Sequence, residues 1–169
     1  MIQMDFSYAN SKENKTDIKS LNLAELEEYI ISMGEKKFRA KQIYKWLHES
    51  FVTSFDEMTN INKDLRNKLE NNCYIATVKP VKVLVSEIDG TRKYLYELKN
   101  GEIIESVLMR YHHGNSVCIS TQVGCRMGCK FCASTLMGLA RNLTASEMLD
   151  QIYAISYIMG ERVSNVVVM

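Results

Sequence analysis

Three cysteines in the second half of the chain have a spacing that could hold a metal. Cys125, Cys129 and Cys132 follow a C-x3-C-x2-C pattern in a stretch that also contains Gly124 and Gly128. Thiolates this close on a glycine-containing loop cannot easily pack as a core, but they can surround one soft metal centre. Three thiolates suffice for a cubane iron–sulfur cluster when its fourth iron is left open for a substrate. The spacing therefore favours an iron–sulfur site with one reactive iron.

Two other uses of the cysteines are less well supported by the sequence. Zinc sites usually take four ligands in paired C-x2-C spacings, so zinc would need a fourth ligand such as Cys118, His112 or His113. A disulfide framework does not suit an odd count of five cysteines or an N-terminus without a visible secretory signal. The iron–sulfur interpretation is preferred, with a zinc site as the alternative.

The wider sequence around the cysteines resembles a known family. The spacing, with Phe131 just before the last cysteine, resembles the signature of the radical S-adenosylmethionine enzymes. Residues 118–134, Gly138 and residues 141–144 resemble the dual-specificity RNA methyltransferases, which methylate C2 of an adenine in 23S ribosomal RNA and in certain transfer RNAs. The resemblance runs from about residue 21 to residue 169. A sister family, which methylates C8 of the same ribosomal adenine, remains an alternative.

The resemblance implies cofactors and site residues. Cys125, Cys129 and Cys132 would ligate a [4Fe-4S] cluster, and its open iron would bind S-adenosylmethionine. The family passes the methyl group through a methyl-cysteine near the C-terminus, and Cys118 matches the second cysteine, which releases the product as a disulfide forms. Glu105 matches the glutamate that takes the C2 proton. By pattern alone, Cys118 would be a packed strand residue and Glu105 a water-exposed one, although apolar neighbours around Glu105 would suit proton transfer if they buried it.

Partners and location follow from the resemblance and the composition together. The resemblance implies 23S rRNA and tRNA as substrates, a reducing electron donor such as flavodoxin or ferredoxin, and a monomer at full length. A net charge of +1 gives no global sign of an RNA-binding protein, so RNA contacts must come from local basic patches. No apolar run approaches the roughly 18 residues needed to span a membrane. Reduced cysteines and an oxygen-sensitive cluster suit the cytoplasm.

The elements around the cysteines predict an α/β fold. A small N-terminal helical domain and a β-hairpin segment precede the first βαβ unit of a partial radical-SAM (β/α) barrel, which is truncated. The predicted parts are a flexible N-terminus at 1–19, a helical accessory domain with possible RNA contact at 20–75, a β-hairpin connector at 76–112, and the start of the barrel with the [4Fe-4S] loop at 113–169.

The N-terminal part shows helical periodicity in three places. Capping residues and apolar spacing predict helices over 22–34, 37–49 and 63–71. The second of these carries a basic stripe, which consists of Lys37, Lys41, Lys45 and His48. Such a stripe can be a solvated helix surface or a face that follows RNA phosphates, because phosphate contacts depend on charge rather than on base sequence.

The C-terminal part alternates strands and one helix. Asp89-Gly90 and Asn100-Gly101 predict tight turns between strands over 81–88, 92–98 and 102–111. A strand over 116–120, a helix over 144–160 and an apolar run over 165–169 then predict a βαβ unit. We expect the run to be a parallel strand buried on both faces. We expect the helix to bury a stripe that consists of Met148, Ile152, Ile155 and Met159. Active sites of such barrels lie at the C-terminal strand ends, where the cysteine stretch begins.

The sequence stops where the family continues. Beyond Met169 the family has a Gly-Glu-Pro segment that contacts S-adenosylmethionine, and later the methyl-carrying cysteine. We therefore expect that this chain alone does not complete methyl transfer and that its last strand exposes an apolar edge, which promotes association. Two further hypotheses are a different radical enzyme with the same cluster and a non-enzymatic RNA-binding or zinc-binding module.

Overall fold

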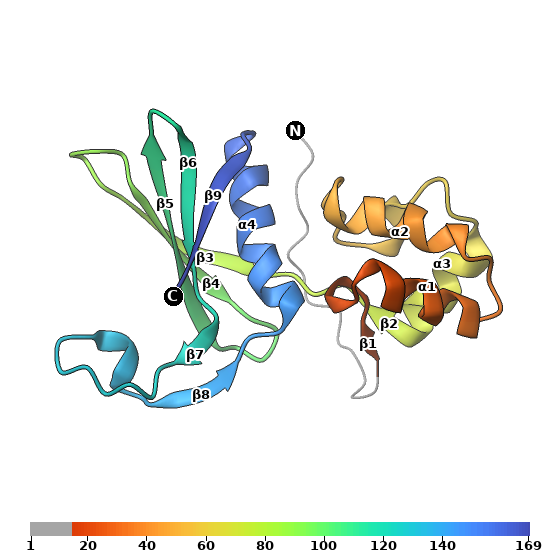
Figure 1. The fold of residues 1–169 in the computed structure, drawn as a ribbon, viewed down its shortest axis with the longest axis horizontal. Helices are drawn as coiled ribbons and strands as arrows, with labels where there is room; N and C mark the ends of the chain where they lie inside the picture. Colours follow the sequence, from red (N-terminus) through yellow and green to blue (C-terminus); the bar gives the residue numbers. More distant parts are fainter. Residues whose placement is uncertain (1–14) are drawn as a thin grey trace. The chain divides into compact units, whose positions relative to one another are not determined.

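The structure, a computed structural model, describes residues 15–169 and divides into two compact units after Thr77 (Figure 1). Residues 1–14, most of the predicted flexible N-terminus, lie outside the described residues. No helix between residues 15 and 169 combines the length and apolar character that a membrane span requires.

The first unit contains three helices around one apolar core. They are α1 (Leu23–Ser32), α2 (Phe38–His48) and α3 (Lys63–Asn72). A short 3-10 turn, η1 (Ile18–Ser20), precedes α1, and a second, η2 (Phe55–Glu57), lies between α2 and α3. The Asn22 side chain accepts hydrogen bonds from two backbone amides of the first turn of α1, and Asn62 does the same for one amide of α3. These caps satisfy amides that the starts of α1 and α3 leave unpaired, whereas α2 begins without a side-chain cap. All three predicted helices are present.

Residues 15–19, in the segment predicted to be flexible, pack against the helical unit just before α1. Strand β1 (Thr16–Asp17) pairs in parallel with β2 (Cys73–Tyr74), which follows α3. Ile18 is fully buried in the helical core. The Lys19 ammonium group donates a hydrogen bond to the carbonyl oxygen of Ala76 at 2.6 Å. The apolar side chain of Ile18 fills the core, and this fixes the backbone around it.

The second unit is built on one five-stranded sheet with strand order β3-β4-β5-β6-β9. Its strands are β3 (Lys79–Val85), β4 (Arg92–Glu97), β5 (Ile103–Tyr111), β6 (Gly114–Ile119) and β9 (Val163–Val168). The first four are antiparallel neighbours, whereas β9 runs parallel to β6. The segment expected to be a separate hairpin connector is therefore part of the same sheet as the βαβ unit.

Helix α4 (Ala145–Met159) connects β6 to β9 and lies on one face of the sheet (Figure 1). A capping box of Thr144 and Glu147 opens it, and Gly160 ends it in the left-handed conformation. The stripe that the sequence predicts to be buried on this helix is only partly buried. Ile155 is fully buried, whereas Met148, Ile152 and Met159 are partly buried. The polar side chains of Asp150 and Gln151 are buried as well. Each of these two polar side chains forms a hydrogen bond to a neighbouring element, which permits its burial.

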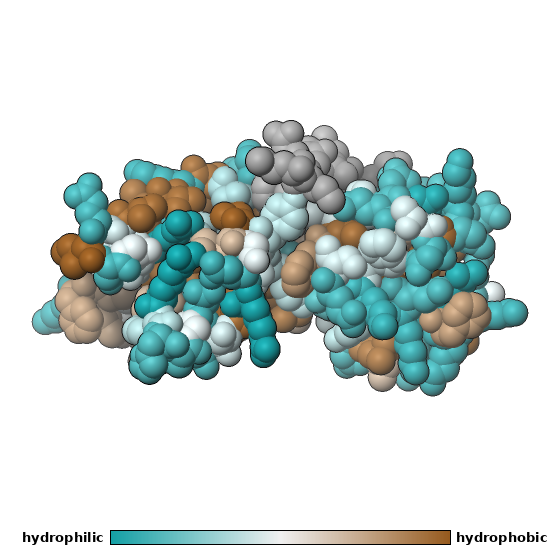
Figure 2. Space-filling model, turned by 90° about the horizontal axis from the view of Figure 1, so that it is seen from above, coloured by the Kyte–Doolittle hydropathy of each residue, from teal (hydrophilic) through white to brown (hydrophobic). Residues whose placement is uncertain are grey.

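Strand β9 is not buried on both faces, contrary to expectation. It pairs with β6 alone within residues 15–169, and Val166, Val167 and Val168 are 44–66% exposed. Strand β3, at the other edge, also exposes Val83, Leu84 and further apolar residues. Figure 2 shows apolar side chains gathered on the surface of this unit. Exposed apolar strands with unpaired edges can pair with other chains, so association stays a prediction.

The amide of Gln151 joins α4 to two strands. Its Oε1 accepts hydrogen bonds from the Ser106 hydroxyl at 2.7 Å and the Ser120 backbone amide at 2.9 Å. Its Nε2 donates to the carbonyl oxygens of Ser120 at 2.9 Å and Glu147 at 3.2 Å. The buried amide therefore holds the end of β6, where the cysteine stretch begins, against β5 and the helix.

We predict that Gln151→Leu lowers the stability of the sheet by about 2–4 kcal/mol, because it leaves the buried Ser106 hydroxyl and the Ser120 amide without their acceptor. Hydrogen exchange of the β5 and β6 amides measures this change within the second unit. Ser106→Ala is the matched control, because it removes one donor and leaves the other three hydrogen bonds in place. An equal or smaller loss for Gln151→Leu than for Ser106→Ala would contradict the assignment.

Candidate functional site

The three cysteines lie on a loop that a short strand pair closes. Strands β7 (Gln122–Gly124) and β8 (Leu139–Asn142) form an antiparallel ladder, and the Cys125 amide donates to the Gly138 carbonyl oxygen at 3.0 Å. We call residues 125–138 between them the cysteine loop. It follows the end of β6 and extends away from the five-stranded sheet (Figure 1). The sequence did not predict this strand pair, because both strands are short and weakly patterned.

Gly124 makes the closed neck of the cysteine loop possible. Its φ of 72° lies in the left-handed region, which favours glycine. A Cβ atom at this position would collide with the carbonyl oxygen of Gly138. Residue 124 must therefore be glycine for the two strands to meet in this way.

The thiols of the cysteine loop are available for ligation. Cys129 is exposed, Cys125 and Cys132 are half-buried, and all three are free thiols. The Cys132 amide donates to the Cys129 carbonyl oxygen at 3.1 Å, and the Thr135 hydroxyl donates to the carbonyl oxygens of both residues. These hydrogen bonds fold residues 129–135 into a tight turn that contains Cys129 and Cys132.

The cysteine loop brings the thiols onto one segment without gathering them around a common centre. Within the described part of the chain, no group of three or more His, Cys, Asp or Glu side chains is close enough to hold a metal ion. All five cysteines are free, so the disulfide expected in the reaction cycle is not supported. Three accessible sulfur donors on one loop nevertheless fit the chemistry of an iron–sulfur cluster.

The histidines considered for zinc lie far from the cysteine loop. His112 and His113 form the turn before β6, and the His113 ring stacks on Tyr111 with centroids 5.1 Å apart. The cysteine loop begins after the opposite end of that strand. Six extended residues span about 20 Å, which is too far for these histidines to share a metal with the loop thiols. The geometry thus removes the histidines as a fourth zinc ligand.

Large apolar side chains stand exposed on the cysteine loop. Phe131 and Met137 are each 94% exposed, and Leu136 and Met127 are 81% and 76% exposed. Side chains of this kind on a surface normally mark a contact site. The cysteine loop therefore offers an apolar surface beside its thiols.

Arg141, on β8, ties the neck of the cysteine loop to two other elements. Its guanidinium forms a two-point ion pair with Glu147 of α4, with both contacts at 2.8 Å, and its Nε lies 2.8 Å from Glu102. Burial alone would raise the pKa of Glu147, but the hydrogen bonds from Arg141 outweigh it and lower that pKa. Sequence patterns missed this contact, because it joins three elements separated along the chain.

Glu105 is partly exposed, as the strand pattern alone predicts, and it is not buried among apolar side chains. The buried face of β5 carries Ile104, Ser106 and Leu108, which point toward α4. Glu105 lies on the other face with 46% of its side chain exposed, and it forms an ion pair with Lys93 at 2.8 Å. An ionised carboxylate is the form that can accept a proton. Lys93, which sequence analysis overlooked, therefore holds the group assigned to proton transfer.

Cys118 lies on the same face of the sheet as Glu105. It stands opposite Val107, two residues along β5 from Glu105, and next to Val167 of β9. Diagonal neighbours of this kind are about 7–8 Å apart. Burial raises the pKa of the Cys118 thiol, so the thiol is protonated at neutral pH. The structure thus brings the two predicted catalytic residues together at the β6 end that leads to the cysteine loop.

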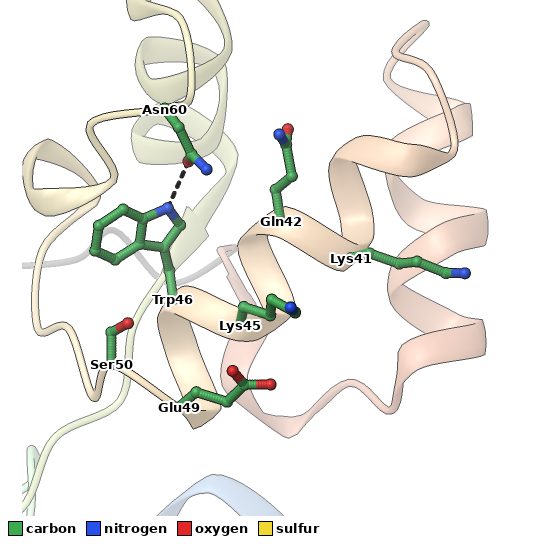
Figure 3. A pocket seen from close by; sticks show the side chains of 7 residues that line it. All are labelled: Lys41, Gln42, Lys45, Trp46, Glu49, Ser50 and Asn60. Atoms are coloured by element: carbon green, nitrogen blue, oxygen red, sulfur yellow. Dashed lines mark hydrogen bonds between the residues drawn. The ribbon is translucent and has the colours of Figure 1, made fainter.

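The predicted basic stripe on α2 divides into paired and unpaired lysines. Lys37 forms an ion pair with Glu27 at 3.0 Å. Lys41 and Lys45 are exposed and form no ion pair with any residue from 15 to 169. They border an open groove of about 570 Å³ (Figure 3), which is lined by Lys41, Gln42, Lys45, Trp46, Glu49, Ser50 and Asn60. The sequence predicted Lys41 and Lys45 as part of the basic stripe, but it did not predict the groove or its other lining residues.

Comparison with known proteins gives consistent matches. Residues 16–75 match the family described as the ribosomal RNA large subunit methyltransferase N-terminal domain. A probable dual-specificity RNA methyltransferase RlmN from Lachnospira eligens is 62% identical over 91% of this chain and 44% of its own length. Its counterpart from Lachnoclostridium phytofermentans is 58% identical over 92% of this chain and 44% of its own.

A solved structure shares the architecture. The crystal structure of a radical SAM methyltransferase from Sphaerobacter thermophilus superposes with a TM-score of 0.80 and 39% identity, over 89% of this chain and 45% of that one. This match confirms the predicted mixed α/β architecture with an N-terminal helical part and a sheet. The chain spans less than half the length of the relatives that it matches.

Proposed function

Since the chain matches the N-terminal portion of the RlmN dual-specificity RNA methyltransferase family, we propose that it provides the cluster-binding part of a radical SAM methyltransferase that modifies C2 of adenine in 23S rRNA and tRNA. The observation that carries the proposal is the placement of three free thiols on a closed loop after β6, beside a sheet face that holds Glu105 and Cys118. Methylation at C8 by the sister family is the alternative.

Cys125, Cys129 and Cys132 would hold the cluster. When bound, a [4Fe-4S] cluster with S-adenosylmethionine supplies the electron transfer that makes an unreactive adenine carbon open to methylation. The β7–β8 ladder and Arg141 hold the loop at its neck, and the loop presents exposed apolar side chains beside the thiols. The chain thus contributes a fixed site for sulfur ligation.

Glu105 and Cys118 would act on the substrate. The Glu105 carboxylate takes the proton from the adenine carbon, and the ion pair with Lys93 holds the carboxylate in place. Cys118 serves as the second cysteine of the family, and its protonated thiol needs a base to become nucleophilic. Both side chains face away from α4, where a substrate can reach them.

The remaining parts of the proposal concern organisation and partners. Residues 20–75 form an accessory domain that contacts RNA, residues 76–112 contribute β3, β4 and β5 to the sheet, and residues 113–169 begin a (β/α) barrel. The protein works in the cytoplasm with a reducing electron donor such as flavodoxin or ferredoxin, and the full-length protein is a monomer.

Anaerobic reconstitution tests the proposal. The chain, supplied with iron and sulfide without oxygen, should turn brown and bind about four irons and four sulfides. The reduced sample should give the electron paramagnetic resonance signal of a [4Fe-4S] cluster. A folded chain that stays colourless, or that binds one zinc and no sulfide, would overturn the proposal and favour a zinc-binding module.

A further inference from the structure

We propose that the groove along α2 binds a single-stranded segment of RNA, with one base against Trp46 and the neighbouring phosphates along Lys41 and Lys45. The groove belongs to the first unit and is separate from the cysteine loop. The choice of RNA as the polymer rests on the proposed function. The groove itself rests on the contacts described below.

Two rows of side chains form the groove (Figure 3). Lys41 and Lys45 are one helical turn apart and form a basic row, while Gln42 and Trp46 form a second row beside it. Residues at i and i+4 lie about 6 Å apart on a helix, which is comparable to the separation of successive phosphates in a single strand. An aromatic side chain next to a basic track is the arrangement that binds single strands without reading their sequence.

Next to its two lysines, the groove offers hydrogen-bond donors from two side-chain amides. The Trp46 indole Nε1 donates to Asn60 Oδ1 at 2.6 Å, and Gln42 Oε1 accepts from Arg39 at 2.9 Å. Each amide thus uses its oxygen within the protein, and its NH2 group is the part that can donate to a ligand. Phosphate oxygens and many base edges are acceptors, so the groove complements a nucleic acid strand.

Charge sets the limits of the groove. Lys37, the third lysine of the predicted stripe, is ion-paired with Glu27 and is therefore less available for phosphates. Glu49 lines the groove one turn beyond Lys45, and its carboxylate repels phosphate there. The bound strand thus contacts two lysines, which predicts a modest salt dependence rather than the steep one of an extended basic surface.

Tryptophan fluorescence provides a direct test, because Trp46 is the only tryptophan of the chain. A short single-stranded RNA should quench this fluorescence in a saturable way, whereas the same sequence as a duplex should quench it much less. The double variant Lys41→Glu/Lys45→Glu should weaken binding at least tenfold. It should also make the slope of log affinity against log salt shallower by about 1.4, or about 0.7 for each lost phosphate contact.

The matched control is Lys36→Glu/Lys63→Glu, which makes the same change in net charge at exposed lysines outside the groove. It should weaken binding no more than twofold to threefold. Binding seen by anisotropy of labelled RNA without any change in tryptophan fluorescence would overturn the proposal, as would equal weakening in both double variants. Equal quenching by polyglutamate would show a general anion site instead. These readouts need no cluster, so they fail or succeed independently of iron binding.

Discussion

Replacing Cys129 with alanine should abolish iron binding by the chain. A cubane held by three thiolates loses its attachment when one is removed, and neither His112 nor His113 can replace the lost thiolate, because both lie at the other end of β6. Iron content should fall from about four atoms per chain to near zero, with loss of the brown colour. Iron and sulfide analysis after anaerobic reconstitution measures the effect.

Cys73→Ala is the control for this experiment. Cys73 is buried in the helical unit, where its thiol donates to the Tyr29 hydroxyl at 3.3 Å, and burial raises its pKa. Its removal should leave iron content unchanged. Full iron content in Cys129→Ala, or an equal loss in both variants, would contradict the assignment of the cysteine loop as the cluster site.

Signals that depend on a few neighbouring residues predicted the structure well. Asn22, Asn62 and Thr144 each start a helix, because a side-chain oxygen next to an apolar repeat satisfies the first unpaired amides. Gly90 and Gly101 turn the chain between strands with positive φ, as their Asx-Gly sequences predict. The spacing of the three cysteines likewise predicts a loop, because the prediction needs only the local sequence.

The sequence did not predict which face of each strand is covered by another element, nor the contacts that depend on it. Alternation in β5 gives two faces, but its pattern does not say which of them α4 covers. The polar Ser106 belongs to the buried face, because Gln151 meets it from the helix, and Glu105 is left on the accessible face. The Lys93–Glu105 and Lys37–Glu27 ion pairs likewise join residues on different elements. A one-dimensional pattern does not contain these pairings.

Gly124→Ala should open the cysteine loop and sharply reduce cluster binding, although all three thiols remain. The added methyl group collides with the Gly138 carbonyl oxygen, so the β7–β8 ladder and the bond from the Cys125 amide cannot form as they do. We expect iron content after a chelator challenge to fall several-fold relative to the unchanged chain. Trypsin should also cut faster after the exposed Arg126 and Lys130 within the loop.

Gly128→Ala separates this collision from ordinary backbone strain. Gly128 also has a positive φ, at 69°, but a Cβ atom there would meet no other atom within 4 Å. Alanine in the left-handed region costs about 1–2 kcal/mol at either position, so both variants share that penalty. Only Gly124→Ala adds the clash at the neck. Equal iron retention and equal trypsin cleavage in the two variants would mean that the closed neck does not hold the thiols in place, whereas a larger effect at position 124 assigns that role to the contact with Gly138.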